Sequence, residues 1–283
     1  MGEGSEADSA RQQEVEAVEV RLLLEGIRSL YGYDFRDYAP ASLGRRLRKI
    51  LEEEGLPSLS RLLEMILHDP AQMGRFLIAL AVPTTAMFRD PGFFLALRQK
   101  AVPLLKDLPF FRVWHAGCST GEEVYSLAIL LEEEGLLPKA RRYATDLSQE
   151  VIDKAKEGIF AAKAMQAYTN NYARSGGHGS FSHYYTAKHD LAIMRPDLAR
   201  EVVWATHNLV SDGSFNEFNL ILCRNVMIYF NPKLQERVHH LLYDSLAMGG
   251  VLGLGRGESL LGSPHADCYR ALDVSEKIFV KVK

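Results

Sequence analysis

From about Phe110 onward, short apolar runs alternate with amphipathic runs that end in glycine, and this alternation restricts the fold more than any other feature. The run "FRVWHAG" has the character of a buried strand, and "EEVYSLAILLEEEG" has that of a helix. The pair recurs as "RRYATD" and "SQEVIDKAKEG", and further strands are predicted at "EVVWATHN", "FNLILC", "VLGLG" and "KIFVKVK". Strands separated by helices predict an α/β, doubly wound and mostly parallel sheet.

The remaining segments define the predicted domains. Residues 1–15 are small, polar and acidic, which predicts a disordered tail. Residues 16–90 show only helical spacing and predict a small all-α N-terminal domain, followed by the α/β domain over residues 91–283. Within that domain, "NPKLQERVHHLLYDSLAMGG" predicts a helix. Residues from about 159 to 200 break the alternation, and we expect an inserted small antiparallel β-subdomain there.

Composition excludes several classes of function. The net charge of -3 gives no global field that would attract nucleic acid or anionic lipid. The longest apolar run, "FLIALAV", is too short to span a bilayer, and the acidic amino terminus lacks the pattern of a signal peptide. Three widely spaced cysteines and no HExxH motif predict neither a disulfide framework nor a metal site. We therefore expect a reduced, cytoplasmic protein without a metal.

The stretch "HAGCSTGEE" joins the first predicted strand to its helix and carries glycines at Gly117 and Gly121. A turn of this kind usually binds phosphate at the helix N-terminus. This one has neither GK[ST] nor GxGxxG, and Glu122 and Glu123 would repel a phosphate. A ligand with cationic groups, such as S-adenosylmethionine, fits better. The alternative is that the two acids only complement the positive helix end, worth at most about 1 kcal/mol.

Two further motifs favour an adenosine-type ligand. Asp146 ends the second strand, where an acid can accept hydrogen bonds from ribose hydroxyls, although it could also cap the next helix. In "LILCRNVMIYFNP", Arg224 and Asn225 follow a buried strand directly. A ligand could supply the partners that such polar groups need, and the alternative is pairing with a surface acid. Tyr229 could stack on a base or line a methyl-transfer pocket.

In their order along the chain, these motifs resemble those of the chemotaxis protein methyltransferases, the CheR-type enzymes that use S-adenosylmethionine to methyl-esterify glutamates on bacterial chemoreceptors. The resemblance extends from about residue 20 to the end. It rests on "LGRRLRKIL", "TTAMFRDPGFF", "AGCSTGEEVYSLA", "ATDLSQEVIDKAKEGIF", "HNLV", "LILCRNVMIYFNPKLQE" and "MGGVLGLGRGESL". It implies a Rossmann-like methyltransferase fold and a protein-glutamate O-methyltransferase activity.

The resemblance also implies contacts for each part of the cofactor. Thr85 and Arg89, in the segment that joins the domains, would close over its amino-acid end, and Arg89 would also act in catalysis by its position. Glu123 and Asp146 would bind the methionyl and ribose parts. The complete predicted cofactor site consists of Thr85, Arg89, Ala116, Gly117, Glu123, Asp146, Asn208, Leu209, Cys223, Arg224, Asn225 and Tyr229.

The later motifs would complete the site. Asn208 and Leu209 would border the adenine, while Arg224 and Asn225 would line the pocket. Tyr229 would lie beside the transferred methyl group and act in catalysis by its position. A glutamate side chain has a pKa of about 4.3 and is already ionised at neutral pH, so we predict no essential general base. The product would be S-adenosylhomocysteine.

One helix carries a candidate surface for the protein substrate. Arg45, Arg46, Arg48 and Lys49 place four cations within five residues. This cluster could bind the cytoplasmic signalling domain of a membrane chemoreceptor, although basic runs are commonly a solvated helix face. In some members of the family the β-subdomain also binds a receptor C-terminal peptide by strand addition. We expect a monomer that binds no nucleic acid.

The chain departs from the family pattern where the two domains join. The usual N-x-T-x-F-F-R is replaced by a sequence with Pro83 in the first position and Met87 in place of an aromatic residue. Pro83 removes one amide side chain that could bind the cofactor. This change leaves open the alternative that the protein is a regulatory module, which binds the cofactor but no longer catalyses methyl transfer. A methyltransferase for a small acid or for a protein other than a receptor is a further alternative.

Overall fold

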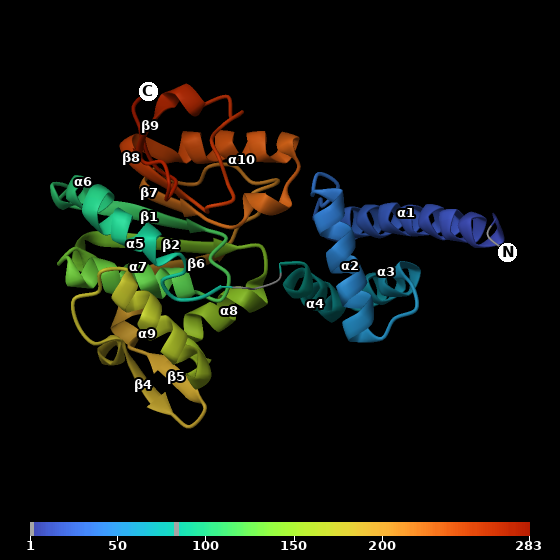
Figure 1. Cartoon of the computed structure of the whole chain (residues 1–283), viewed down its shortest axis with the longest axis horizontal. Helices are drawn as coiled ribbons and strands as arrows, with labels where there is room; N and C mark the ends of the chain where they lie inside the picture. Colours follow the sequence, from blue (N-terminus) through green and yellow to red (C-terminus); the bar gives the residue numbers. More distant parts are fainter. Residues whose placement is uncertain (1–2, 82–84) are drawn as a thin grey trace. The chain divides into compact units, whose positions relative to one another are not determined.

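The computed structural model describes residues 3–81 and 85–283. The chain divides into two compact units, and Figure 1 shows its elements coloured along the sequence. Unit 1 comprises Met1–Val82 with Tyr229–Asn231, and unit 2 comprises Pro83–Ile228 with Pro232–Lys283. The boundary between the units falls between residues 82 and 83, whereas the sequence predicts it between residues 90 and 91.

Unit 1 is helical. Leu23, Leu24 and Ile27 recur at helical spacing and are buried on one face of its first helix. The third helix is capped by Ser58, whose hydroxyl accepts the Arg61 N–H at 3.3 Å. The helices are α1 (Glu3–Tyr31), α2 (Pro40–Glu54), α3 (Leu59–His68) and α4 (Pro70–Ala81).

The predicted disorder of residues 1–15 differs from the structure, in which α1 begins at Glu3. The segment is polar, but after Gly4 it has neither glycine nor proline up to Gly26. Most of its residues are alanine, glutamate, glutamine and arginine, which favour helices, and they continue into the amphipathic turns that are buried further along α1. Polarity alone was therefore misleading.

The main sheet of unit 2 has the strand order β6-β2-β1-β7-β8-β10-β9. The pairs from β6 to β8 are parallel, whereas β10 pairs with β8 and β9 in the antiparallel sense. This confirms the predicted doubly wound, mostly parallel sheet. The strands are β1 (Phe111–Ala116), β2 (Ala140–Asp146), β6 (Val202–Thr206), β7 (Phe218–Cys223), β8 (Leu246–Leu254), β9 (Tyr269–Asp273) and β10 (Ile278–Lys281).

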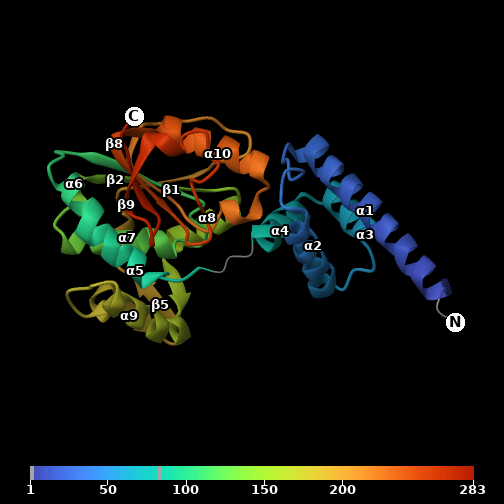
Figure 2. The same ribbon diagram turned by 45° about the horizontal axis from the view of Figure 1, so that its top comes forward.

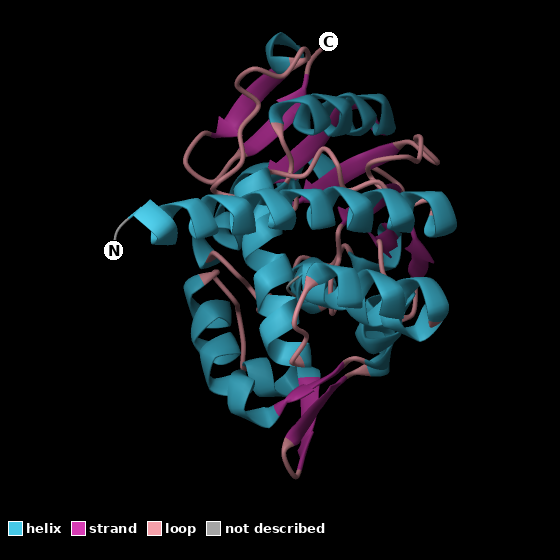
Figure 3. Cartoon of the chain, turned by 90° about the vertical axis from the view of Figure 1, so that its right-hand side faces the viewer, coloured by secondary structure: helices cyan, strands magenta, loops and turns pink. Residues whose placement is uncertain are grey.

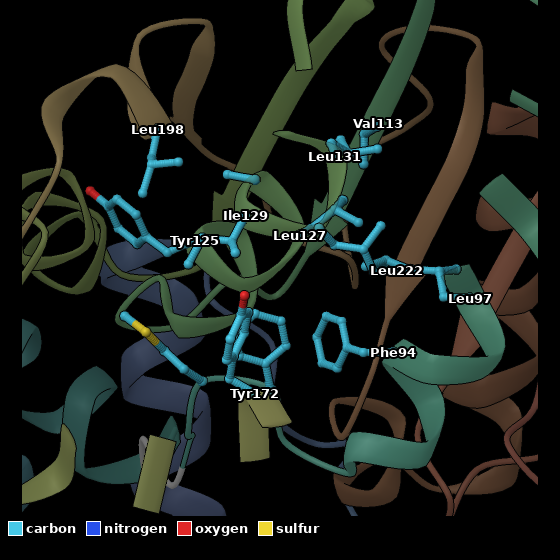
Figure 4. Close-up of a cluster of buried hydrophobic side chains, with 14 of the residues drawn as sticks. Phe94, Leu97, Val113, Tyr125, Leu127, Ile129, Leu131, Tyr172, Leu198 and Leu222 are labelled. Carbon is cyan, nitrogen blue, oxygen red and sulfur yellow. The ribbon is translucent and has the colours of Figure 1, made fainter. Parts of the chain in front are cut away.

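Helices cover this sheet, with α10 on one side and α5 and α7 on the other in Figures 1 and 2. α10 is shorter than predicted because the chain turns at Ser245 into β8, whose apolar residues pair with β7. In Figure 4, apolar side chains of α7 such as Leu127 face Val113 of β1 and Leu222 of β7. The helices are α5 (Pro91–Ala96), α6 (Val102–Lys106), α7 (Glu122–Glu133), α8 (Gln149–Glu157), α9 (Met165–Arg174) and α10 (Pro232–Ser245).

The predicted inserted subdomain is confirmed as a small antiparallel sheet with the order β3-β5-β4 (Figure 3). Its strands are β3 (Ile159–Ala161), β4 (Tyr185–Lys188) and β5 (Leu191–Met194). The insertion also contains α9, between β3 and β4, which the sequence pattern did not predict. Tyr172 of α9 packs against Phe88, with ring centroids 5.3 Å apart, and so attaches the insertion to the rest of unit 2.

Candidate functional site

The order of the parallel strands reverses beside β1, because β2 and β6 continue the sheet on one side and β7 and β8 on the other. In open parallel sheets, ligands bind at the carboxyl ends of the strands where the order reverses. Those ends are Ala116 of β1 and Cys223 of β7, and both belong to the predicted cofactor site. We call the carboxyl ends of β1, β2, β6 and β7, with the loops that follow them, the switch-point edge.

The "HAGCSTGEE" turn crosses the switch-point edge in left-handed backbone conformations, with φ of 82° at Gly117 and 94° at Gly121. Packing also requires the two glycines. A Cβ at Gly117 would lie 2.5 Å from Val226 Cγ2, and one at Gly121 would lie 3.0 Å from the Ala155 Cβ. The turn therefore fits tightly against the loop after β7, and α7 begins directly behind it at Glu122.

Glu123 lies at the start of α7 and is held by hydrogen bonds to both carboxylate oxygens. Its Oε1 lies 2.9 Å from His115 Nδ1, and its Oε2 accepts Arg224 Nη1 at 3.2 Å. Burial by itself would raise the pKa of Glu123, but the hydrogen bond with His115 and the charge of Arg224 outweigh it and lower that pKa. Glu123 is thus ionised at neutral pH and paired with Arg224.

Arg224 follows β7 and connects two segments of unit 2. Its side chain is 2% exposed and forms ion pairs with Glu123 and, at 2.9 Å, with Asp90. It also donates to the Arg89 carbonyl at 3.1 Å and lies over the Phe93 ring, 4.0 Å from the centroid. In this structure the guanidinium of Arg224 therefore pairs with two carboxylates of the chain, Glu123 and Asp90.

Asp146 ends β2, as predicted, and organises the backbone around it. Its Oδ2 accepts the Ser119 N–H at 2.9 Å, and its Oδ1 accepts the Leu147 N–H at 2.8 Å. Burial raises the pKa of Asp146, and these backbone hydrogen bonds oppose the rise. The cap of α8 is the Ser148 side chain rather than Asp146. A carboxylate has about four acceptor positions, so Asp146 keeps capacity for a ligand hydroxyl.

Asn208 and Leu209 follow β6 at the same edge. The preceding residue, His207, donates its backbone N–H to the Asp146 carbonyl at 3.0 Å. The Asn208 side chain folds back and accepts the Val210 N–H at 2.9 Å, while Leu209 is 8% exposed. This places both residues close to Asp146 along the edge, which is consistent with the predicted border of an adenosine.

The segment before α5 supplies the other predicted contacts. Thr85 and Arg89 are half-buried, and Met87 is fully buried, so it fills an apolar position as expected. Phe88 and Asp90 have left-handed φ values of 51° and 56°, which are uncommon for such residues. Hydrogen bonds hold this conformation, including one of 2.8 Å from the Phe88 N–H to a buried serine of α7. Pro83 lies outside the described residues.

Tyr229 belongs to unit 1 by its contacts. Its carbonyl accepts the Ala39 N–H at 2.9 Å, and its ring lies under the Arg46 guanidinium, 3.6 Å from the ring centroid. Arg46 is 5% exposed and also donates to the Leu80 carbonyl. Arg46 therefore does not belong to the predicted basic surface, because its position on α2 faces the interior of unit 1.

The rest of the predicted basic surface is exposed. Arg45, Arg48 and Lys49 lie on the outer face of α2. Arg48 pairs with Glu16 at 3.1 Å, and Lys49 pairs with Glu53 at 3.4 Å. These exposed acids neutralise part of the cationic face, so Arg45 contributes most to any net positive potential.

Two residues of the site were missed in the sequence analysis. His115 is fully buried in β1 and orients Glu123, and Asp90 pairs with Arg224. His115 could have been predicted from its position, because it is a histidine in a mostly apolar strand, two residues before the first glycine of the turn. Asp90 could not have been predicted in this way. It follows Arg89 in the motif "FRDPGFF", but its partner Arg224 lies far away in the sequence.

Within residues 3–81 and 85–283, no cluster of three or more His, Cys, Asp or Glu side chains is arranged to bind a metal ion. Cys118 and Cys223 are buried thiols, and Cys268 is a half-buried one. Among the helices in this same part of the chain, none has both the length and the apolar character needed to cross a membrane.

Comparison with known proteins agrees with this geometry. The family described as "CheR methyltransferase, SAM binding domain" matches residues 83–275, and "CheR methyltransferase, all-alpha domain" matches residues 19–81. A Pseudomonas putida protein, "Putative methyltransferase Cher3", is 46% identical over 264 residues, which are 93% of this chain and 97% of that protein.

More distant relatives carry a more specific name. The Salmonella typhimurium "Chemotaxis protein methyltransferase" is 32% identical over 236 residues, covering 79% of this chain and 76% of that protein. A Listeria innocua protein of the same name is 28% identical over 81% of this chain and 86% of its own length. With a switch-point edge built around Glu123 and Asp146 and both family domains matched in order, the chain belongs to the CheR methyltransferase family.

Proposed function

We propose that the protein transfers a methyl group from S-adenosylmethionine to glutamate side chains of a bacterial chemoreceptor and releases S-adenosylhomocysteine. The observation that carries the proposal is the pair of carboxylates, Glu123 and Asp146, fixed by protein donors at the switch-point edge. Family membership supports the cofactor. The names of relatives such as the Salmonella typhimurium protein support the receptor as substrate.

The residues at the edge fit the cofactor chemically. Glu123 is ionised and can attract a cationic group, while Asp146 keeps acceptor capacity for hydroxyl groups. The glycine turn leads into the start of α7, whose first N–H groups can face a ligand. Thr85, Arg89, Asn208, Leu209 and Asn225 would complete the binding site in this proposal.

Little acid–base chemistry is needed for this reaction. When bound, S-adenosylmethionine supplies a methyl group on a positively charged sulfur, which becomes a neutral thioether as the methyl carbon bonds to a carboxylate oxygen. The substrate carboxylate is ionised at neutral pH, because a glutamate pKa is about 4.3. The chain therefore has to align the reactants, which can contribute roughly 7–11 kcal/mol. Arg89 and Tyr229 would act in this way, through position and electrostatics.

The protein substrate in this proposal is the cytoplasmic signalling domain of a membrane receptor, so the enzyme would act in the cytoplasm, as a monomer. Arg45, Arg48 and Lys49 on α2 are exposed and could attract its acidic surface. The small sheet has an edge strand, β4, along which a receptor C-terminal peptide could add as a further strand. Neither nucleic acid nor membrane insertion has a part in this function.

Calorimetry and methyl transfer test the proposal in sequence. The purified chain should bind S-adenosylhomocysteine and should then transfer tritiated methyl groups to receptor signalling fragments. Base-labile label on receptor glutamates is the expected result. If the chain binds no cofactor, the proposal fails at its first step. Binding without transfer to any receptor of a panel would instead indicate a regulatory module, and label on a small acid or an unrelated protein would indicate a different methyltransferase.

A further inference from the structure

Glu258 lies in the loop after β8 and is 5% exposed, yet its hydrogen bonds connect it to a distant part of the chain. Its Oε1 accepts the backbone N–H groups of Val226 and Met227, each at 2.8 Å. Its Oε2 accepts those of Asn225 at 3.0 Å and Gly255 at 2.6 Å. One buried carboxylate thus satisfies three consecutive amides of the loop after β7 and one amide of its own loop.

These hydrogen bonds hold the loop in a defined conformation. Asn225 has φ of 62°, in the left-handed region, which asparagine enters more readily than most other non-glycine residues. Three successive N–H groups that converge on one point form a concave anion site, and a carboxylate in it is a strong acceptor. Glu258 therefore supplies the negative charge that holds residues 225–227 in place.

Gly255 makes the close approach of the two loops possible. A Cβ at this position would lie 2.7 Å from Glu258 Oε2 and 2.8 Å from the Asn225 backbone nitrogen. Both distances are shorter than packed atoms tolerate, so any side chain here would push the loops apart. The segment "GRGESL" thus carries the acid and the glycine that allows it to reach residues 225–227.

The fixed loop lies directly against the glycine turn of the switch-point edge. Val226 occupies the space in which a Cβ of Gly117 would stand, only 2.5 Å from its Cγ2. Arg224, the partner of Glu123, precedes the same loop. A displacement of residues 225–227 would therefore move the wall of the proposed cofactor site and the anchor of Glu123 together.

We propose that Glu258 is a positioning residue of the methyltransferase site, which holds residues 225–227 against the glycine turn and so sets cofactor affinity and alignment. This inference rests on the proposed function. It assigns no contact between Glu258 and either substrate. The carboxylate acts only through the backbone amides of Asn225, Val226 and Met227.

Glu258→Gln is the direct test, because it keeps the shape of the side chain but replaces one acceptor oxygen with a donor. Each oxygen accepts two amides, so the substitution leaves two of the four N–H groups without an acceptor. We expect S-adenosylhomocysteine affinity to fall about tenfold or more. We also expect kcat for receptor methylation to fall by up to about 100-fold, since small displacements of aligned groups cost this much.

Glu133→Gln provides a matched control. Its side chain is 5% exposed and accepts hydrogen bonds from Arg98, Tyr172, Tyr184 and the His178 N–H. It ends α7, at the opposite end of the helix from Glu122 and the switch-point edge. This variant should lose stability in urea unfolding but keep the affinity and kcat of the wild type within about twofold.

Gly255→Ala is a second variant that disturbs the same contact without removing the charge. It should reproduce the loss of affinity and kcat, and it keeps the inference testable if Glu258→Gln does not fold. The inference is overturned if Glu258→Gln, or Gly255→Ala in its place, retains wild-type affinity and kcat, or loses no more than the Glu133→Gln control. A wild-type chain that binds no cofactor would instead overturn the proposed function itself.

Discussion

Replacing Arg224 with methionine tests the electrostatic arrangement at the switch-point edge. The arginine is 2% exposed and forms ion pairs with Glu123 and Asp90, and a methionine would keep the packing over Phe93 while it removes the charge. Removal of one partner of a buried ion pair costs about 3–5 kcal/mol, because it leaves a buried charge without compensation. Both carboxylates keep some solvent contact, and Glu123 keeps its bond to His115. We therefore expect a loss of about 3 kcal/mol.

The loss of unfolding free energy in the Arg224→Met variant should depend on pH. In the wild type the pKa of Glu123 is lowered, so its contribution to stability is present above the ordinary glutamate pKa of about 4.3 and is lost as the pH falls through the lowered value. In the variant, burial is no longer opposed by Arg224, and Glu123 takes up a proton more readily. The difference in unfolding free energy should therefore be larger at about pH 7.5 than at about pH 5.

Urea unfolding of both proteins at these two pH values gives the measurement. Lys156→Met is the matched control in the same unit, since Lys156 is 42% exposed and its ion pair with Asp153 should contribute less than about 1 kcal/mol. A loss at Arg224 no larger than that of the control, or a loss that grows as the pH falls, would refute the reasoning. S-adenosylhomocysteine affinity should also decrease in the Arg224 variant, because Glu123 loses its anchor.

Three further predictions concern separate parts of the protein. Asp146→Asn should weaken S-adenosylhomocysteine binding about tenfold to 100-fold in calorimetry, and unchanged affinity would contradict the role of Asp146. Replacing Arg45, Arg48 and Lys49 with glutamate should slow receptor methylation at low salt while cofactor affinity stays constant; equal rates would remove α2 from the substrate surface. Leu127→Ala, at a fully buried position, should lower the unfolding free energy by about 2–5 kcal/mol in urea, and a loss below about 1 kcal/mol would contradict its place in the core.

Single residues show where prediction from the sequence ends. Arg46 and Arg48 occupy one helix and look equivalent in the sequence, but Arg46 is buried over the Tyr229 ring and Arg48 is exposed beside Glu16. Helical periodicity can distinguish these two arginines only when the buried face of α2 is already known. β9 was missed because it is short and half-exposed, without a continuous apolar run, and it is recognisable only by its pairing with β10.

The sequence by itself determined the architecture and the class of site, since both depend on local patterns. Alternating apolar and amphipathic runs specify the parallel sheet, and the glycine turn with Glu123 and the acid that ends β2 specify the kind of ligand. Only the tertiary structure decided which groups hold those carboxylates. Arg224 pairs with Glu123 and Asp90, which lie 101 and 134 positions away, and Glu258 binds the Asn225 N–H, 33 positions away. Such pairings arise from the strand order rather than from any local pattern.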